Sequence, residues 1–375
     1  MEGNAGRGRQ RWFSPPRVSD EPNSRRLRGV IACLRAVKGL AIGLVAAFIC
    51  TALHAPLPWM IGPLLALAAC RVAGIDCEAP AGGRQAGQWV IGTALGLYFT
   101  PAVAELVLRL WWLLLIGAFF ALALGYFCGF VLTVVARTDR ATALFASVPA
   151  GAAEMAVLGE RYGARVHEVA AGQSLRLMLV VVVIPWIFTA LGVHGADRFQ
   201  TGIAEVHGLG LAALLALTLG GGLLLQRTGL PNAFVLGALA VAIPLTLAQI
   251  DLSAVPRWLT NAAQLLLGCA LGARFERSFL RRAPRFVAAV VLSVAAAMLL
   301  SALFALAIAA ATDLHPATLV LATAPGGIAE MSITAKVLEL GVPVVTAFHV
   351  TRVVVLLTCT APVFAWLRRA RGSGS

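Results

Sequence analysis

Two segments of this chain carry a proline, a glycine two residues later and a glutamate three residues after that. They are TALFASVPAGAAEM, with Pro149, Gly151 and Glu154, and TLVLATAPGGIAEM, with Pro325, Gly327 and Glu330. Proline lacks a backbone N–H and glycine relaxes backbone sterics, so each segment should be a helix that breaks and restarts after the glycine. The restarted helix exposes free N–H groups that attract an anion. Its glutamate either caps the helix or handles a coupling ion or proton.

Two arginines, Arg176 and Arg352, lie at matching positions inside the apolar runs that follow the breaks. A guanidinium group suits a carboxylate or phosphate ligand because it donates two parallel hydrogen bonds. The alternative is an internal ion pair with Glu154 or Glu330 that holds the break in shape. The two roles are compatible, since a bound anion would displace the glutamate from its arginine.

A third matched pair, Gln173 and His349, precedes the arginines by one helical turn and should face the same side. A hydrogen-bonded core histidine is the alternative for His349. All these pairs belong to a duplication of the chain with a shift of 176 positions, which also aligns QWVIGTALGLYF (88–99) with QLLLGCALGARF (264–275). A duplicated half in a membrane protein suggests a transporter whose site lies at the breaks.

Composition places the chain among polytopic membrane proteins. Of its 375 residues, 59% are hydrophobic and 13% are charged, whereas soluble domains contain about 25% charged residues. The formal charge of +13 does not indicate a nucleic-acid partner, because the arginines lie between apolar runs, where they set orientation in the membrane. Membrane lipid and a small-molecule or ion substrate are the expected partners, and a homo-oligomer is left open.

The residue types that bind metals or perform hydrolysis are not arranged for these tasks. The seven cysteines contain no C-x-x-C and the six histidines are scattered, so neither a disulfide framework nor a metal site is expected. The chain has no Walker loop, no G-x-S-x-G and no H-E-x-x-H. We therefore expect no cofactor and no enzymatic activity.

The positions of the arginines also predict how the repeats cross the membrane. Each repeat has six apolar segments, and the fifth is the broken one. If the fifth segment enters and leaves on one side, each repeat crosses five times and the second repeat is inverted. The loops after residue 38 then hold fifteen Lys or Arg residues inside and four outside, whereas a crossing fifth segment gives nine inside and ten outside. The positive-inside rule favours the first arrangement.

The predicted fold is therefore all-α, with two inverted repeats of about five transmembrane helices, each with a Pro/Gly-broken or re-entrant segment. Both termini are expected in the cytoplasm. The predicted divisions are a disordered basic tail at 1–37, repeat one at 38–192, an outer connecting loop at 193–206, repeat two at 207–367 and a cytoplasmic tail at 368–375.

At these motifs the chain resembles the duplicated bacterial membrane AbrB family over residues 38–367. The shared features are a P-x5-G span start, a G-x-A-L-G span whose small residues allow close helix packing, and the doubled P-x-G-x-x-E-M segment. Members of that family carry labels of a regulator of gene expression or an ammonia monooxygenase. The broken-helix repeat is also similar, at the level of fold, to bile acid/sodium symporters and cation–proton antiporters.

The expected function is secondary transport of a small organic anion or metabolite across the bacterial inner membrane by alternating access, coupled to H⁺ or Na⁺. Glu154 and Glu330 would handle the coupling ion. The helix N-termini near Gly151 and Gly327, with the two arginines, would hold the anion. A membrane-bound regulator or sensor is the first alternative, and a monooxygenase is the second.

Overall fold

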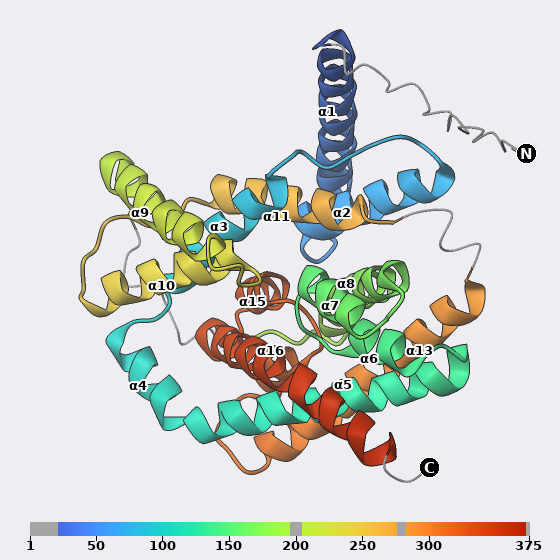
Figure 1. Ribbon diagram of the computed structural model, residues 1–375. Helices are drawn as coiled ribbons and strands as arrows, with labels where there is room; N and C mark the ends of the chain where they lie inside the picture. The colour runs from blue at the N-terminus through green and yellow to red at the C-terminus, as the bar shows by residue number, and fades with distance from the viewer. Residues whose placement is uncertain (1–21, 196–204, 276–282, 373–375) are drawn as a thin grey trace, which may run out of the picture.

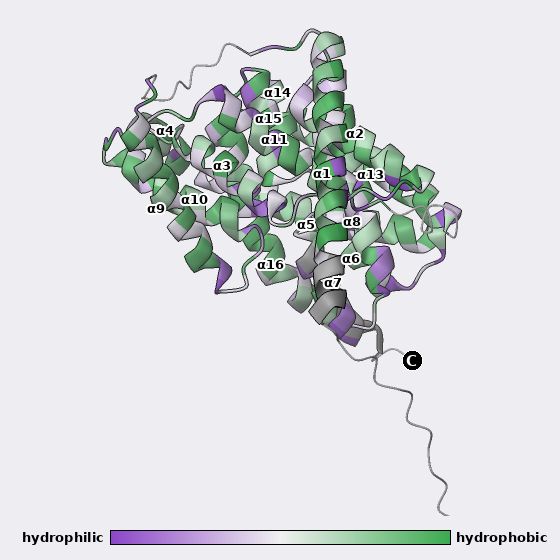
Figure 2. Ribbon diagram, turned by 90° about the horizontal axis from the view of Figure 1, so that it is seen from above, coloured by the Kyte–Doolittle hydropathy of each residue, from purple (hydrophilic) through white to green (hydrophobic). Residues whose placement is uncertain are grey.

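The computed structural model describes residues 22–195, 205–275 and 283–372, and within these ranges every regular element is a helix. Six of the described helices are long and apolar enough to cross a membrane, three in each repeat. They are α1 (Pro22–Ala52), α5 (Trp111–Ala136), α8 (Val166–Ala190), α9 (Gly208–Gln226), α13 (Pro284–Ala309) and α16 (Val342–Gly372). Most of the ribbon in Figure 2 has the green colour of hydrophobic residues. The predicted all-helical, multi-pass membrane fold is confirmed.

Four shorter helices contain 14 to 16 residues, namely α2 (Pro58–Ala73), α3 (Gly83–Gly96), α10 (Ala233–Leu247) and α11 (Arg257–Gly272). At 1.5 Å per residue they are about 21 to 24 Å long, shorter than the hydrocarbon core of a bilayer. They pack as two crossing pairs, α2 on α11 and α3 on α10. A Cβ added to Gly92 would lie 2.7 Å from the carbonyl oxygen of Val235, and one added to Gly268 would overlap Met60. These glycines of the G-x-A-L-G motif therefore serve close packing, as predicted.

Both predicted helix breaks are present. Helices α6 (Arg140–Ser147) and α7 (Ala152–Arg161) flank residues 148–151, and α14 (Pro316–Thr323) and α15 (Ile328–Val337) flank residues 324–327. The residue before each proline is extended, with ψ of 125° at Val148 and 144° at Ala324, because the proline ring disfavours helical geometry there. We call residues 139–165 the first hairpin and residues 315–341 the second hairpin.

Each hairpin returns to the place where it starts. The backbone N–H of Arg165 donates to Thr142 Oγ1 at 2.7 Å, and the backbone N–H of Gly341 donates to Thr318 Oγ1 at 3.3 Å. The repeat shift matches Thr142 with Thr318 and Arg165 with Gly341. Because the two ends of each segment are hydrogen-bonded to each other, neither segment runs from one face of the molecule to the other. This geometry favours the re-entrant arrangement.

Helix α8 separates the bases of the two hairpins. It begins at Val166, directly after the first hairpin. Beyond its other end, the N–H of Gly195 donates to the carbonyl oxygen of Leu338 in the second hairpin at 3.0 Å. The 25 residues of α8 rise by about 37 Å. The bases of the two hairpins therefore lie near opposite ends of α8, while the inversion of the repeats and their orientation in the membrane stay predictions.

Most contacts between helices fall within two groups. The scaffold group contains α1 to α3 and α9 to α11, and the hairpin group contains α5 to α8 and α13 to α16. Figure 1 shows the scaffold group above the hairpin group, and α7 and α15, which belong to the hairpin group, lie near the middle of the view. The contacts follow the repeat. Helix α5 of repeat one packs on α16 of repeat two, and the matching helices, α13 of repeat two and α8 of repeat one, pack on each other in turn. Helix α4 (Pro101–Arg109), bent by 94° from α3, contacts both groups.

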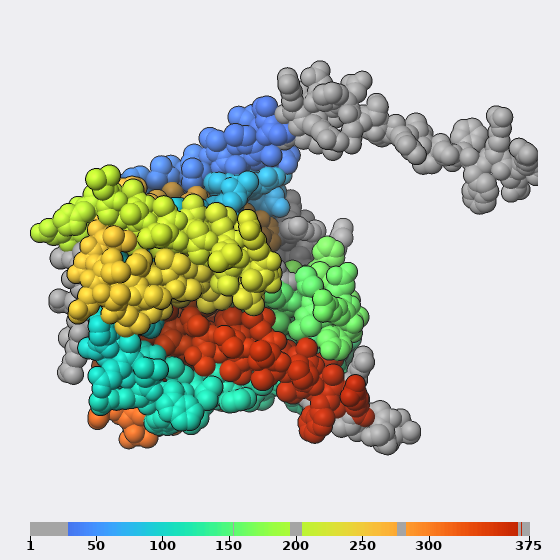
Figure 3. Space-filling view, turned by 60° about the vertical axis from the view of Figure 1, so that its left-hand side comes forward, coloured from blue at the N-terminus to red at the C-terminus, as the bar shows by residue number. Residues whose placement is uncertain are grey.

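One surface of the molecule exposes the junction between the groups. In Figure 3, α16 lies between α9 and α10 on one side and α5 on the other. The largest hydrophobic cluster nevertheless runs through both groups, with Leu239 of α10 and Val353 of α16 among its buried members. The two groups therefore share a core, and the breaks lie inside it.

One boundary predicted from the sequence is wrong. Helix α1 begins at Pro22, so residues 22–37 of the predicted disordered tail are helical. This stretch is rich in Arg, Leu and Ala, which have high helix propensity, and Arg35 binds Asp76 and Glu78 of the loop after α2, both at 3.3 Å. Helix α16 likewise continues into the predicted C-terminal tail. Parts of both tails and of the outer loop, and the segment that contains Arg277, Arg281 and Arg282, lie outside the described residues, at 1–21, 196–204, 276–282 and 373–375.

Candidate functional site

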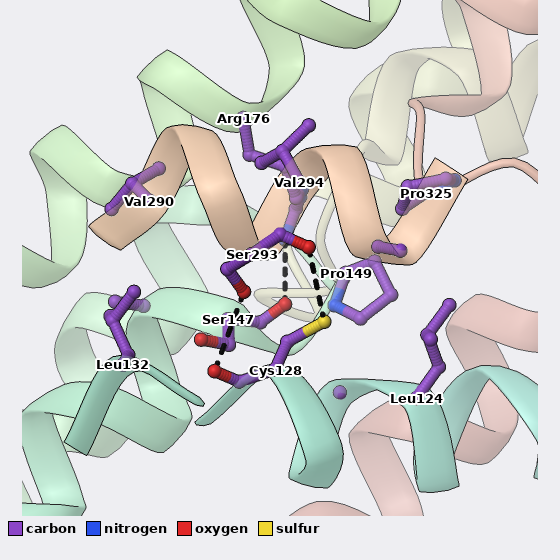
Figure 4. Close-up of a pocket in the computed structure, with 13 residues that line it drawn as sticks. Leu124, Cys128, Leu132, Ser147, Pro149, Arg176, Val290, Ser293, Val294 and Pro325 are labelled. Carbon is purple, nitrogen blue, oxygen red and sulfur yellow. Dashed lines mark hydrogen bonds between the residues drawn. The ribbon is translucent and has the colours of Figure 1, made fainter. Parts of the chain in front are cut away.

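The two breaks meet in the interior of the protein. Pro149 of the first hairpin and Pro325 of the second hairpin line one small cavity of about 20 Å³, together with Arg176 (Figure 4). The cavity lies against α5 and α13, which are joined by a hydrogen bond of 3.4 Å from Ser293 Oγ to the carbonyl oxygen of Cys128. Segments that enter from opposite ends of the molecule therefore come together around one point.

A second cavity opens beside the first, between the scaffold group and the hairpin group. We call it the central cavity. Its volume of about 40 Å³ leaves room for roughly three water molecules. The scaffold group contributes Arg84, Gln88, Asn232 and Arg274, and the hairpin group contributes Arg176, Arg352, Glu330 and both breaks. An anion larger than a few waters therefore requires the two groups to separate.

The two buried arginines brace the breaks through backbone carbonyls. Arg176 Nη1 donates to the carbonyl oxygens of Ser147 at 3.2 Å and Val148 at 3.0 Å. Arg352 Nη1 donates to the carbonyl oxygen of Ala324 at 2.6 Å, and its Nη2 donates to that of Gly326. These carbonyls lie at or just beyond the ends of α6 and α14, where they lack intrahelical partners and carry partial negative charge. Each guanidinium group therefore supplies hydrogen-bond donors to the carbonyl oxygens at the C-terminal end of the helix that precedes its break.

Gln173 and His349 perform the same task one helical turn earlier. Gln173 Nε2 donates to the carbonyl oxygens of Phe145 at 2.7 Å and Val148 at 2.8 Å. His349 Nε2 lies 3.0 Å from the carbonyl oxygen of Leu321, and Leu321 matches Phe145 under the repeat shift. A glutamine and a histidine thus reach equivalent carbonyls, which explains why the two residue types occupy one repeat position.

The bracing contacts leave part of these side chains without a partner. The Nε atoms of Arg176 and Arg352, Gln173 Oε1 and His349 Nδ1 are buried and make no hydrogen bond. Within the described part of the chain, no ion pair joins either arginine to Glu154 or Glu330. The arginines hold the breaks in shape, but through carbonyl oxygens and not through the glutamates.

The two glutamates fold back over their own helix starts. A Cβ added to Gly151 would overlap the carboxylate of Glu154, and one added to Gly327 would overlap that of Glu330. Both carboxylates therefore sit at the positive ends of α7 and α15, as helix-capping residues do. The breaks need glycine at this point because the carboxylate takes the place of a side chain.

The surroundings of the two glutamates differ. Glu330 is 8% exposed and lines the central cavity. Glu154 is half-buried and lines a separate cavity of about 350 Å³, beside Arg161 and Leu357. Of the two glutamates, Glu330 is thus the one that lines the central cavity.

Two arginines that spacing did not single out, Arg84 and Arg274, line the central cavity from the scaffold group. Gln88 Nε2 donates to Asn232 Oδ1 at 3.0 Å, and Arg84 Nη2 reaches the same oxygen at 3.5 Å. Arg274 interacts electrostatically with both glutamates. The sequence signal was present, since Arg84 precedes the motif glutamine Gln88 by one helical turn on α3.

The charges around the central cavity favour a bound anion. Four guanidinium groups line it against one carboxylate, that of Glu330. The N-termini of α7 and α15 add partial positive charge at Ala152 and Ile328. Within the described residues, no group of three or more His, Cys, Asp or Glu side chains is placed to hold a metal ion. The excess of positive charge makes the cavity chemically suited to a small anion.

Comparison with known proteins identifies the family. Residues 59–368 match the family described as "Transition state regulatory protein AbrB". The chain is 26% identical over 362 residues to "Uncharacterized protein YhjN" of Bacillus subtilis (strain 168), an alignment that covers 89% of this chain and 93% of that protein. It is 25% identical over 319 residues to "Putative regulator AbrB" of Escherichia coli (strain K12), covering 84% of this chain and 90% of that protein. Because the family match spans well over half of its length, the chain belongs to the AbrB family.

Proposed function

We propose that this protein is a secondary transporter that moves a small organic anion or metabolite across the bacterial inner membrane by alternating access, coupled to H⁺ or Na⁺. One observation carries the proposal: two hairpins that enter from opposite ends of α8 meet at one cavity lined by four guanidinium groups. Non-helical backbone at membrane depth is tolerated where it is buried or lines a polar cavity. In secondary transporters, such broken segments form the substrate site.

The position of the central cavity between the two helix groups supports alternating access. One wall is carried by the scaffold group through Arg84 and Arg274, and the other by the hairpin group through the breaks. A movement of one group against the other would open the cavity without breaking the contacts inside either group. A bound anion would join the two walls, because both present positive charge to it.

The paired glutamates are the candidates for the coupling ion. Ionisable residues at membrane depth are costly to bury and are functional by default. Glu154 lies in the first hairpin and Glu330 in the second, each three residues after the glycine of its break. Their carboxylates would bind a proton or Na⁺ and so couple its movement to that of the anion.

The proposal is tested by thermal unfolding of the detergent-purified protein with acetate, succinate, citrate, phosphate and sulfate, with and without Na⁺. An anion that binds the native state only should raise its stability by about 2.7 kcal/mol at a hundred times its dissociation constant. The Arg84→Gln/Arg274→Gln double variant should lose the response. The control is Arg109→Gln, whose arginine is exposed on α4 and pairs with Glu105 at 2.5 Å. A wild-type protein indifferent to every anion would contradict the proposal.

A membrane-bound regulator is the second candidate, favoured by the names of the family and of the E. coli relative. Such a protein must transmit a signal through a part of the chain outside the bundle, and the basic segment at 1–37 is the candidate. Deleting residues 1–21 separates the two functions. A regulator would lose its effect on transcription, whereas a transporter would keep its anion response.

A further inference from the structure

The carboxylate of Glu330 lies where an anion would be held. It sits at the N-terminus of α15 and lines the central cavity. The charged groups that interact with it come from three other parts of the chain: Arg84 on α3, Arg274 after α11 and Arg352 on α16. No ion pair within 4 Å joins Glu330 to these arginines among the described residues. The carboxylate therefore faces the guanidinium groups across the cavity.

The other helices packed against α15 place no second carboxylate in the lining of the central cavity. Helix α8 contributes Arg176 to the cavity and α16 contributes Arg352, while His349 of α16 is turned to the carbonyl oxygen of Leu321. Helix α14 contains no titratable residue. Lys336 lies at the far end of α15, over the ring of Tyr98 at 5.8 Å. Glu330 is thus the one carboxylate that lines the central cavity within the described chain.

Resting on the proposed transport function, we propose that Glu330 occupies the anion site of the empty protein, and that a substrate anion binds there only after a proton has neutralised this carboxylate. The substrate then takes the place of the carboxylate between the N-terminus of α15 and the guanidinium groups of Arg84 and Arg274. One negative charge enters as a proton cancels another, so the charge of the site is unchanged. The coupling ion is H⁺, and anion and proton move in the same direction.

The geometry of the site explains why one proton is taken up for each anion that binds. A cavity of about 40 Å³ has no room for an anion beside the Glu330 side chain, so the anion must take the place of the carboxyl group. Without the proton, two negative charges at one helix N-terminus would also repel each other. Glu154 also interacts with Arg274, but it is half-buried, lines a different cavity and is not among the residues that line the central cavity. The inference therefore assigns proton coupling to the second hairpin alone.

Calorimetric titration of the full-length protein in detergent tests the inference. The anions named above are titrated at one pH in two buffers that differ in ionisation enthalpy, and acetate, which carries a single negative charge, tests the charge balance directly. We expect uptake of one proton for each anion bound. Above the pH at which Glu330 ionises, affinity should fall about tenfold for each pH unit. The Glu330→Gln variant should bind the anion with neither proton uptake nor this pH dependence, while Glu105→Gln, on the exposed surface of α4, should behave as wild type.

The outcomes separate this inference from the proposed function. Anion binding without proton uptake in the wild-type protein, or proton uptake that persists in Glu330→Gln, would overturn the inference and leave the transport proposal standing. The wild-type titration decides the matter even if the variant does not fold. Absence of binding by every anion at every pH between 5 and 8 would overturn both.

Discussion

The two hairpins share one sequence pattern but lie in different surroundings. In the second hairpin, α15 is buried over its first eight residues, whereas α7 of the first hairpin is exposed along one face. The base of the first hairpin carries ion pairs, in which Arg165 contacts Asp139 at 3.3 Å and Glu168 at 2.5 Å. The base of the second has no ion pair among the described residues, and its contacts include the N-cap of α14 by His315 Nδ1 at 3.3 Å.

The comparison separates what the repeated motif determines from what its neighbours determine. The motif sets the break, the arginine brace and the glutamate over the helix start, and these features are the same in both halves. The neighbours decide which glutamate faces the central cavity, and only Glu330 does so. A duplicated pattern can therefore build a symmetric scaffold around an asymmetric site.

The arginine braces should give the largest effect. Replacing Arg352 by Ala leaves the carbonyl oxygens of Ala324 and Gly326 without donors, and each buried orphan costs roughly 1 to 3 kcal/mol. We expect a loss of about 3 kcal/mol from the free energy of unfolding, measured by thermal unfolding in detergent. Arg176→Ala should cost less, because Gln173 Nε2 still donates to the carbonyl oxygen of Val148. If Arg176→Ala loses as much free energy of unfolding as Arg352→Ala, or more, the difference between the two hairpins is contradicted.

The break glycines should give the next largest effect. An alanine at Gly327 places a methyl group on the Glu330 carboxylate, and the enclosed second hairpin has little room to move it. Overpacking of this kind costs about 2 kcal/mol, and the anion response of thermal unfolding should be lost. In Gly151→Ala the half-exposed Glu154 can swing outward, so stability should change little. A larger effect at Gly151 would contradict the assignment of the enclosed site to the second hairpin.

The glutamine and histidine pair offers a smaller test. His349→Ala leaves the carbonyl oxygen of Leu321 without a donor and should cost about 1 to 2 kcal/mol. His349→Gln should cost less than about 1 kcal/mol, because Gln173 already fills the equivalent role in the first hairpin. The two variants are compared by thermal unfolding at one pH. If the glutamine destabilises as much as the alanine, the side chains are not equivalent donors.

The smallest expected effect is the pH dependence of the first hairpin base. Burial opposes ionisation of Asp139, but hydrogen bonds from Thr142 and Arg165 outweigh it and hold the pKa of this carboxyl below its usual value. The ion pair therefore stabilises the folded state above about pH 4 and is lost as pH falls through the lowered pKa. Asp139→Asn, which keeps a helix cap, should cost less than about 1 kcal/mol at neutral pH. The difference from wild type should vanish in acid, and a difference that grows in acid would contradict this account.

The sequence predicted the breaks and their partners in the repeat, because proline and glycine act locally and a duplication shows itself by a constant shift. It did not predict what the buried arginines contact, since the carbonyl oxygens of Val148 and Ala324 lie 28 residues away and carry no sequence signal. Arg84 and Arg274 were counted with the loop arginines that set orientation. Only the folded arrangement brings them to the central cavity, because α3 and α11 must first pack against α10 and α2.

The most direct test of the central claim is the side from which each hairpin enters the membrane. Single cysteines at Arg140, at the base of the first hairpin, and at Asp313, beside the base of the second, are placed in a background without accessible native cysteines. A membrane-impermeant thiol reagent is then applied to right-side-out and inverted vesicles. The account predicts labelling of position 140 from the cytoplasmic side only and of position 313 from the outer side only. Labelling of both positions from the same side would contradict it.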